Sequence, residues 1–232
     1  MNKIKAAALS TSVAVSLLAG ATGANAATLH FDNTTSVSSN NPFTGASGSL
    51  MLTFMDTGLS GIASVLASVT NTTGVGAAFG AGATTSTMTG VGFDFLTGVT
   101  YVVNSFSGGA IFDTLILNAN ARPFDTLDIA LADNSNYNGG NANNGLTQGN
   151  SDAASFRLSY SGYTNAAALD AAFGSAFSAG TLQASMRFQQ VNAGAGSDKL
   201  NYAPSVVPLP AAGWLLLAGI GGLFAARRRK TA

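Results

Sequence analysis

Apolar and polar side chains alternate without a break in the stretch Leu182-Gln183-Ala184-Ser185-Met186-Arg187-Phe188-Gln189. Successive side chains of a β-strand point to opposite faces, so this alternation predicts a strand with one buried face. Similar alternation or short apolar runs recur in the segments 50–55, 64–70, 91–95, 100–106, 111–117, 127–131 and 155–160. Clusters of Gly, Asn and Asp, which favour turns, separate these segments. The pattern predicts an all-β fold, a single antiparallel β-sandwich of the jelly-roll type.

One segment departs from the strand pattern and predicts a short helix. Leu169, Phe173 and Phe177 are spaced by four residues among many alanines, which places them on one face of a helix. Thr164 or Asn165 stands at its start, and either side chain is suited to cap it. We therefore expect the β-sandwich to contain one helix that ends at Phe177.

The charged residues of this 232-residue chain are segregated, although ten Lys and Arg formally balance ten Asp. Residues 27–205, which we call the body, hold all ten Asp but only four cations, so their net charge is about −6. A body of this charge has no basic patch for phosphates, which excludes nucleic acid as a partner. The absence of Cys excludes disulfides, Cys-ligated zinc and thiol nucleophiles.

Residues 1–26 have the three parts of a secretory signal peptide. Two lysines near the start are followed by 13 uncharged, mostly apolar residues. Small residues then define a cut between positions 26 and 27, namely Ala24, Ala26 and Ala27. Thirteen residues at about 1.5 Å each do not cross a hydrocarbon core of about 30 Å, which disfavours an uncleaved anchor helix.

An apolar segment without any charge covers residues 211–226 and predicts a transmembrane helix. Extended back to Val206, the uncharged run has 21 residues, which is long enough to span a bilayer. A basic tail follows at 227–230, and we predict that it acts as a stop-transfer signal through Arg227, Arg228, Arg229 and Lys230. Four glycines in the run disfavour a helix buried in a soluble core, where each costs about 1 kcal/mol. We expect the body outside the membrane and the tail in the cytoplasm.

A short proline motif precedes the apolar segment and consists of Val207, Pro208, Leu209, Pro210 and Ala211. Together, the motif, the apolar segment and the basic tail resemble the sorting signal of the PEP-CTERM family of surface proteins, in its VPLPA-CTERM variant. In that family, an exosortase-type membrane protease recognises the motif and removes the helix. The product is released or transferred to the cell surface, often in Gram-negative bacteria that make an exopolysaccharide matrix. Leu209 replaces the Glu of the commonest form, so the resemblance does not specify the processing enzyme.

The resemblance implies three parts: a signal peptide (1–26), a β-sandwich ectodomain (27–205) and a sorting signal (206–232). The segment Met186–Val191, followed by Gly196–Leu200, also resembles the last strand and tail of many PEP-CTERM surface proteins. That similarity implies a secreted β-domain without known active-site residues. The expected location is the bacterial inner membrane before processing and the cell surface or the extracellular space afterwards.

Two sequence patterns suggest catalysis, and we predict that neither supports it. Asp56-Thr57-Gly58 spells the core tripeptide of aspartic proteases, but the chain has no second copy to pair the carboxylates. Asp and Gly directly after an apolar strand predict a turn instead. Asp125 and Asp128 are three residues apart, which on a strand points them to opposite faces and disfavours a glycosidase pair. Since His30 is the only histidine, we predict no catalytic residues and no enzyme activity.

The Asn-rich segment 133–152 and the Gly-rich segment 74–90 are predicted to be loops. Three asparagines of the first segment fall at the first, third and fifth positions of a calcium-binding loop. However, Gly145 stands at the twelfth position in place of a bidentate Glu. We expect no cofactor and keep calcium as an alternative, with Asp133 and Asp152 as its charged ligands.

These features predict an exported cell-surface or extracellular-matrix protein with a structural or adhesive role. One alternative is a lectin-like module that binds extracellular polysaccharide, with or without calcium. Another is a single-pass membrane protein whose tail is never removed. Sugar sites commonly use exposed aromatic rings, and the only Trp, Trp214, lies in the predicted membrane segment. The lectin alternative therefore depends on Tyr101, Tyr137, Tyr160, Tyr163 and Tyr202.

Overall fold

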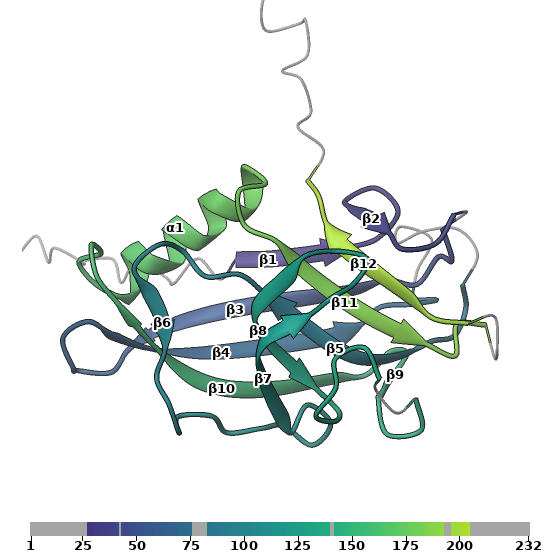
Figure 1. Cartoon of the computed structure of the whole chain (residues 1–232), viewed down its shortest axis with the longest axis horizontal. Helices are drawn as coiled ribbons and strands as arrows, with labels where there is room; N and C mark the ends of the chain where they lie inside the picture. The colour runs from purple at the N-terminus through teal and green to yellow at the C-terminus, as the bar shows by residue number, and fades with distance from the viewer. Residues whose placement is uncertain (1–26, 42, 76–82, 140–141, 193–195, 205–232) are drawn as a thin grey trace, which may run out of the picture.

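The computed structural model describes five stretches of the chain, namely residues 27–41, 43–75, 83–139, 142–192 and 196–204 (Figure 1). Strands dominate them, which confirms the predicted β-rich fold class. The predicted sorting motif, transmembrane helix, basic tail and signal peptide lie outside the described residues, although Ala27 is the first residue of strand β1. Within these five stretches, no helix combines the length and the apolar composition needed to cross a bilayer.

Five antiparallel strands form what we call the first sheet. In spatial order they are β1 (Ala27–Phe31), β3 (Gly48–Asp56), β4 (Ile62–Asn71), β10 (Ser151–Tyr160) and β6 (Val99–Tyr101). Side chains of the long strands alternate between the core and the outer face, as predicted. On β4, Val65, Ala67 and Val69 are buried, whereas Ser64 and Ser68 between and beside them are partly exposed.

The remaining strands form the second sheet, which is also antiparallel. Its spatial order is β2 (Ser36–Ser38), β12 (Asp198–Tyr202), β11 (Ala184–Gln189), β5 (Thr87–Phe93), β8 (Thr126–Ala132) and β7 (Thr114–Asn120). The two-residue strand β9 (Leu146–Thr147) also pairs with β5. The alternating stretch 182–189 thus supplies β11, a central strand that pairs with β12 and β5. The prediction of a single buried face is wrong, because Ser185 and Arg187 are buried on the other face.

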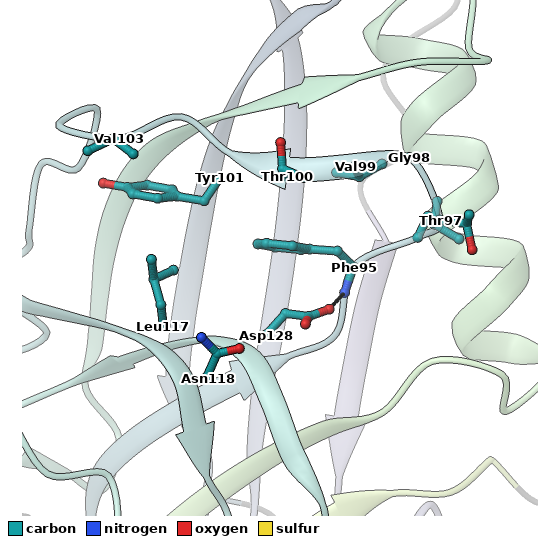
Figure 2. A pocket seen from close by; sticks show the side chains of 11 residues that line it. Phe95, Thr97, Gly98, Val99, Thr100, Tyr101, Val103, Leu117, Asn118 and Asp128 are labelled. Atoms are coloured by element: carbon teal, nitrogen blue, oxygen red, sulfur yellow. Dashed lines mark hydrogen bonds between the residues drawn. The ribbon is translucent and has the colours of Figure 1, made fainter.

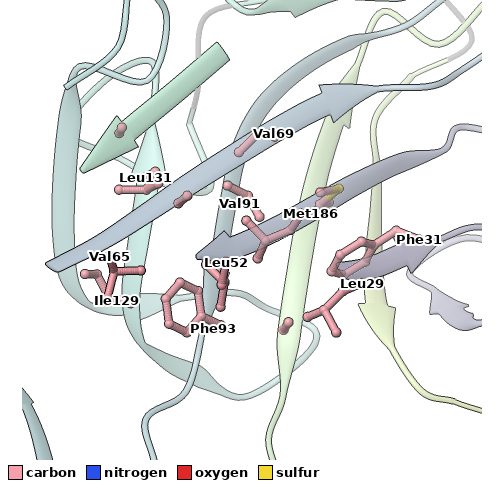
Figure 3. Close-up of a cluster of buried hydrophobic side chains, with 14 of the residues drawn as sticks. Leu29, Phe31, Leu52, Val65, Val69, Val91, Phe93, Ile129, Leu131 and Met186 are labelled. Carbon is pink, nitrogen blue, oxygen red and sulfur yellow. The ribbon is translucent and has the colours of Figure 1, made fainter. Parts of the chain in front are cut away.

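Side chains from both sheets form one hydrophobic core (Figure 3). Leu52 and Val65 of the first sheet belong to the same buried cluster as Val91 and Met186 of the second. Phe93 of β5 is 1% exposed and lies within ring contact of four other aromatic residues. The centroid of its ring lies 6.0–6.4 Å from those of Phe95, Phe156, Phe173 and Phe177.

The one helix of the described residues, α1 (Ala166–Ser178), connects β10 of the first sheet to β11 of the second. Asn165 is its N-cap, and the side-chain oxygen accepts a hydrogen bond from the backbone N–H of Ala168 at 2.8 Å. Phe173 and Phe177 are fully buried in the shared core. The predicted helix and one of the two predicted caps are confirmed.

The Asp-Thr-Gly tripeptide forms a turn, as predicted. Gly58 has φ of 77°, a backbone conformation that favours glycine, and the Thr57 hydroxyl donates to the carbonyl of Ile62 at 2.8 Å. The Asp56 carboxylate accepts a hydrogen bond from the backbone N–H of Ala166 at 2.9 Å. This carboxylate therefore anchors the first turn of α1, where unpaired N–H groups favour a negative charge.

The second strand and the last strand of the described chain pair in the second sheet. β12 pairs with β2, with Leu200 opposite Ser38. The buried Asp198 carboxylate accepts hydrogen bonds of 2.6–3.1 Å from the hydroxyls of Ser38, Ser39 and Thr44. This cluster fastens the segment after β2 to the last hairpin.

Several boundaries differ from the predictions. Segment 74–90 includes the start of β5, and segment 133–152 includes β9 and the start of β10. β5 is buried on both faces, and its first residues, Thr87–Gly90, fall in the segment that Gly and Thr marked as a loop. The short strands β1, β2 and β12 also show too little pattern to be predicted. β6 ends at Tyr101 rather than at Phe106, because Asn104, at φ of 61°, turns the chain.

Candidate functional site

A groove opens between β6, an edge strand of the first sheet, and β7, an edge strand of the second (Figure 2). Its volume is about 460 Å³, which lies within the range of small-ligand sites. The lining residues come from β6, β7, β8 and the segment Phe95–Gly98. The groove therefore exists only because strands distant in the sequence meet at this edge.

The segment 94–98 carries the chain from β5 to β6 and forms one wall of the groove. It is held by backbone hydrogen bonds on both sides: Asp94 N–H donates to the carbonyl of Gln183 at 2.9 Å, and Gly98 accepts from Ser161 N–H at 3.0 Å. A further bond, from Val99 N–H to the carbonyl of Leu96 at 3.0 Å, closes the turn into β6. Residues next to a strand of each sheet, Gln183 before β11 and Ser161 after β10, thus hold this wall in place.

Two half-buried aromatic rings line the groove. Phe95 packs edge-on against the core ring of Phe93 at 6.0 Å, and Tyr101 contacts Phe156 at 6.4 Å between centroids. Figure 2 shows Phe95 and Tyr101 on the same wall, with Leu117 of β7 across from them. Leu117 is 45% exposed and offers apolar surface to the groove.

Polar groups lie at the opposite wall. One oxygen of the Asp128 carboxylate accepts a hydrogen bond from the backbone N–H of Phe95 at 2.7 Å, which fixes this side chain against the groove (Figure 2). Asn118 of β7 falls between the register pairs Leu117–Ile129 and Ala119–Leu127 and has φ of 52°. The left-handed backbone at Asn118 interrupts the regular strand at the groove.

A second cavity of about 510 Å³ adjoins the first. The two cavities share Phe95, Leu96, Thr97 and Asp128, and the second continues toward Leu182 at the start of β11. Because four residues line both, we treat them as one elongated groove.

The second cavity is acidic. Burial raises the pKa of Asp94, and the negative charges of Asp128 and Asp125 raise it further, although the N–H groups of Gln183 and Asp128 donate to its carboxylate. Asp125 precedes β8 instead of lying within it, so the premise that Asp125 and Asp128 lie on one strand does not hold. Both carboxylates interact with Asp94.

The described lining of the elongated groove supplies groups for hydrogen bonding and stacking. Of the described residues that line either cavity, none is His, Lys, Arg or Ser. Hydroxyl, amide and carboxylate groups remain, together with two aromatic rings. Such a lining offers hydrogen bonds and a stacking surface for a polar organic ligand.

The calcium candidate Asp152 holds a backbone segment. Its carboxylate accepts hydrogen bonds from the N–H groups of Ala110, Ile111 and Phe112 at 3.1, 2.9 and 2.8 Å. Burial by itself would raise the pKa of Asp152, but hydrogen bonds from these N–H groups and from Ala153 outweigh it and lower the pKa. The carboxylate stabilises the turn that leads into β7.

The other calcium candidate, Asp133, belongs to a different environment. It follows β8, and its charge attracts the guanidinium of Arg187 on β11. The structure thus gives Asp133 and Asp152 separate partners. Among the described residues, no three His or Asp side chains are placed to hold a metal ion. Calcium binding through the Asn-rich loop stays a prediction.

The Asn-rich loop covers the outer face of the second sheet through Tyr137. This tyrosine is 2% exposed, and its hydroxyl donates to the carbonyl of Ser185 at 2.9 Å. A Cβ atom at Gly90 would lie 2.9 Å from the Tyr137 ring, so glycine is needed there for close packing. Beside it, Arg187 donates to the Thr89 hydroxyl at 3.1 Å. Tyr137 therefore fixes the loop and is not exposed to a ligand.

Of the tyrosines considered as sugar platforms, Tyr101 alone lines the groove. Tyr202 packs against Phe31 and Phe177, and Tyr160 pairs with Tyr163. Sequence reasoning did not single out the other groove residues, Phe95, Leu117 and Asn118, because nothing local distinguishes them from strand residues.

Comparisons with known proteins add no relative from which a function could be transferred. No family model, no curated protein and no solved structure matches this chain.

Proposed function

We propose that this chain is an exported protein that is sorted through its C-terminal signal to the cell surface or the extracellular matrix. There the body serves a structural or adhesive role. The observation that carries the proposal is the order of the proline motif, the uncharged run 211–226 and the basic tail 227–230.

In this proposal the apolar run anchors the body in the bacterial inner membrane only until an exosortase-type membrane protease removes it. The four terminal cations stop translocation, because moving them across the membrane is costly. The acidic body carries no comparable barrier and passes to the outside.

We also infer that the two sheets pack face to face as one β-sandwich of the jelly-roll type. Side chains of both sheets share one core, and the chain passes repeatedly between the sheets. It goes from β1 to β2, from β2 to β3, from β4 to β5, from β5 to β6 and from β6 to β7, each time changing sheet. Frequent crossing of this kind is typical of Greek-key sandwiches.

The intact mass of the extracellular form tests export and processing. We expect a chain that begins at Ala27 and lacks Trp214. An extracellular or surface form that retains Trp214 would instead support the uncut single-pass membrane protein. Recovery of the full-length chain in the cytosol would contradict export.

Neutral replacement of the basic tail tests the stop-transfer role. With Gln in place of Arg227, Arg228, Arg229 and Lys230, the tail should pass through the membrane and appear unprocessed in the medium. A matched control, Arg157→Gln, removes one exposed cation of the body and should leave sorting unchanged. Normal sorting of the tail variant would contradict the proposed role of these residues.

Polysaccharide binding is a second candidate function, and the elongated groove favours it. An open groove with aromatic rings, a fixed carboxylate and an amide suits a sugar better than a flat strand surface does. Binding measured with and without a chelator would show whether calcium takes part, as the alternative prediction for Asp133 and Asp152 requires.

A further inference from the structure

We propose that the elongated groove between β6 and β7 binds an uncharged sugar chain, with its pyranose rings against Phe95 and Tyr101. The proposal rests on the second candidate function, polysaccharide binding, and names the class of polysaccharide. Four features of the groove support it: its rings, its polar groups, its charge and its length.

The rings are positioned before any ligand binds. A pyranose presents a face of C–H groups, which packs favourably on an aromatic ring. Phe95 and Tyr101 are half-buried, and their inner sides contact the core rings Phe93 and Phe156. Because the core already restricts their rotamers, little side-chain entropy is lost when a sugar stacks on them.

The polar groups match sugar hydroxyls. The backbone N–H of Phe95 donates a hydrogen bond to one oxygen of Asp128, with 2.7 Å between the nitrogen and the oxygen. This bond fixes the direction of the carboxylate. The second oxygen and the side-chain amide of Asn118 border the same groove (Figure 2). A carboxylate and an amide together accept and donate hydrogen bonds, as neighbouring hydroxyls of a sugar require.

The charge of the groove selects against acidic polymers. Asp94 and Asp128 line the second cavity, Asp125 lies near them, and no described lining residue is a cation. The body as a whole is negative as well. A uronic acid, sulfate or phosphate group would therefore meet repulsion without a compensating partner, whereas a neutral sugar would not.

The length of the groove favours a chain over a single sugar. Two cavities of about 460 and 510 Å³ share four residues, and the pair continues from β6 to the start of β11. Affinity should therefore rise from a monosaccharide to an oligosaccharide of the same sugar, as successive rings occupy both cavities.

The test measures binding of the full chain, purified in detergent, to immobilised polymers. Dextran, laminarin and galactomannan are the neutral probes, and alginate and polygalacturonate are the acidic ones.

We expect the unchanged chain to bind at least one neutral polymer. The affinity should fall by at least about tenfold in Phe95→Ala and in Tyr101→Ala. Tyr101→Phe keeps the ring and should bind within a few-fold of the unchanged chain. Tyr163→Ala, a matched tyrosine outside the groove, should bind normally.

Each outcome decides between the two proposals. If acidic polymers bind and neutral ones do not, polysaccharide binding stands and the inference of an uncharged ligand is wrong. If no polymer binds, both are wrong. If a neutral polymer binds equally to the unchanged chain and to both alanine variants, the groove is not its site. Thermal melting of each variant, which should stay cooperative, separates lost binding from lost folding.

Discussion

The aromatic cluster around Phe93 is covered on one side and open on the other. On the covered side, α1 places Phe173 and Phe177 in the core with no exposed surface. On the open side, Phe95 and Tyr101 contact the same core but line the groove between β6 and β7. The difference lies in the covering element, because both sides present aromatic rings to the core.

This comparison separates stability from ligand binding. Aromatic residues under α1 remove large apolar areas from water and should dominate the free energy of unfolding. Those at the groove bury only part of each ring, so their replacement should cost less stability. Four predictions test the comparison, in order of decreasing effect.

The largest effect is expected from Phe173→Ala, on the covered side. Removal of a fully buried ring leaves a cavity in the core and should lower the free energy of unfolding by about 3–5 kcal/mol. Phe95→Ala, on the open side, should cost about 1 kcal/mol, because its ring is only half-buried. Urea unfolding measures both, and equal losses would show that the two sides do not differ.

Asp152→Ala removes the acceptor of three backbone hydrogen bonds in the segment that leads into β7. We expect a loss of about 2–3 kcal/mol at pH 7, whereas Asp113→Ala, an exposed carboxylate nearby, should change little. The lowered pKa of Asp152 means that its stabilisation is present above the ordinary value of 3.8 and is lost as the pH falls through the lower folded value. The difference between the unchanged chain and the variant should therefore shrink in acid. A pH-independent difference would contradict this.

Asn165→Ala tests the start of the covering helix. Loss of the bond to Ala168 N–H should lower the free energy of unfolding by about 1 kcal/mol. Thr164→Ala is the matched control, since Thr164 is the other candidate cap in the sequence and should have a smaller effect. A larger loss from Thr164→Ala in thermal or urea unfolding would reverse the assignment of the cap.

Asp94→Asn should have the smallest effect, with the opposite sign. The raised pKa of Asp94 means that its charged form is disfavoured in the fold, so stability is lost as the pH rises through the folded value. A neutral amide should make the protein slightly more stable at pH 7, and the gain should disappear below the ordinary value of 3.8. Unfolding curves at pH 7 and pH 3 measure this difference, and a loss of stability at pH 7 would show that the hydrogen bonds of Asp94 outweigh its repulsion.

The covered side was largely predictable from the sequence. Leu169, Phe173 and Phe177 repeat at helical spacing, and Asn165 is a residue type that caps helices, so local interactions specify α1. Alternation likewise predicts β3, β4 and β11, because apolar and polar side chains follow one another with a period of two in their sequences. These signals are local, and each can be found within about ten residues.

The groove was not predictable, because its residues come together only through pairing between distant strands. Tyr101 and Leu117 belong to different sheets, and β6 joins the first sheet only by pairing with β10, more than fifty residues later. Asn118 and Asp128 likewise line one groove only because β7 pairs with β8. No single segment carries this information. β5 was partly missed for a related reason, since the covering loop with Tyr137 hides its outer face.

The pairing of β12 with β2 has a consequence for the order of folding. Ser36–Ser38 find their partners only among residues 200–202, and the hydroxyl cluster around Asp198 needs the same late segment. A polypeptide that emerges from its N-terminus therefore completes the second sheet only after nearly all of the body has been delivered. Such delayed closure couples the final folding step to arrival of the last strand.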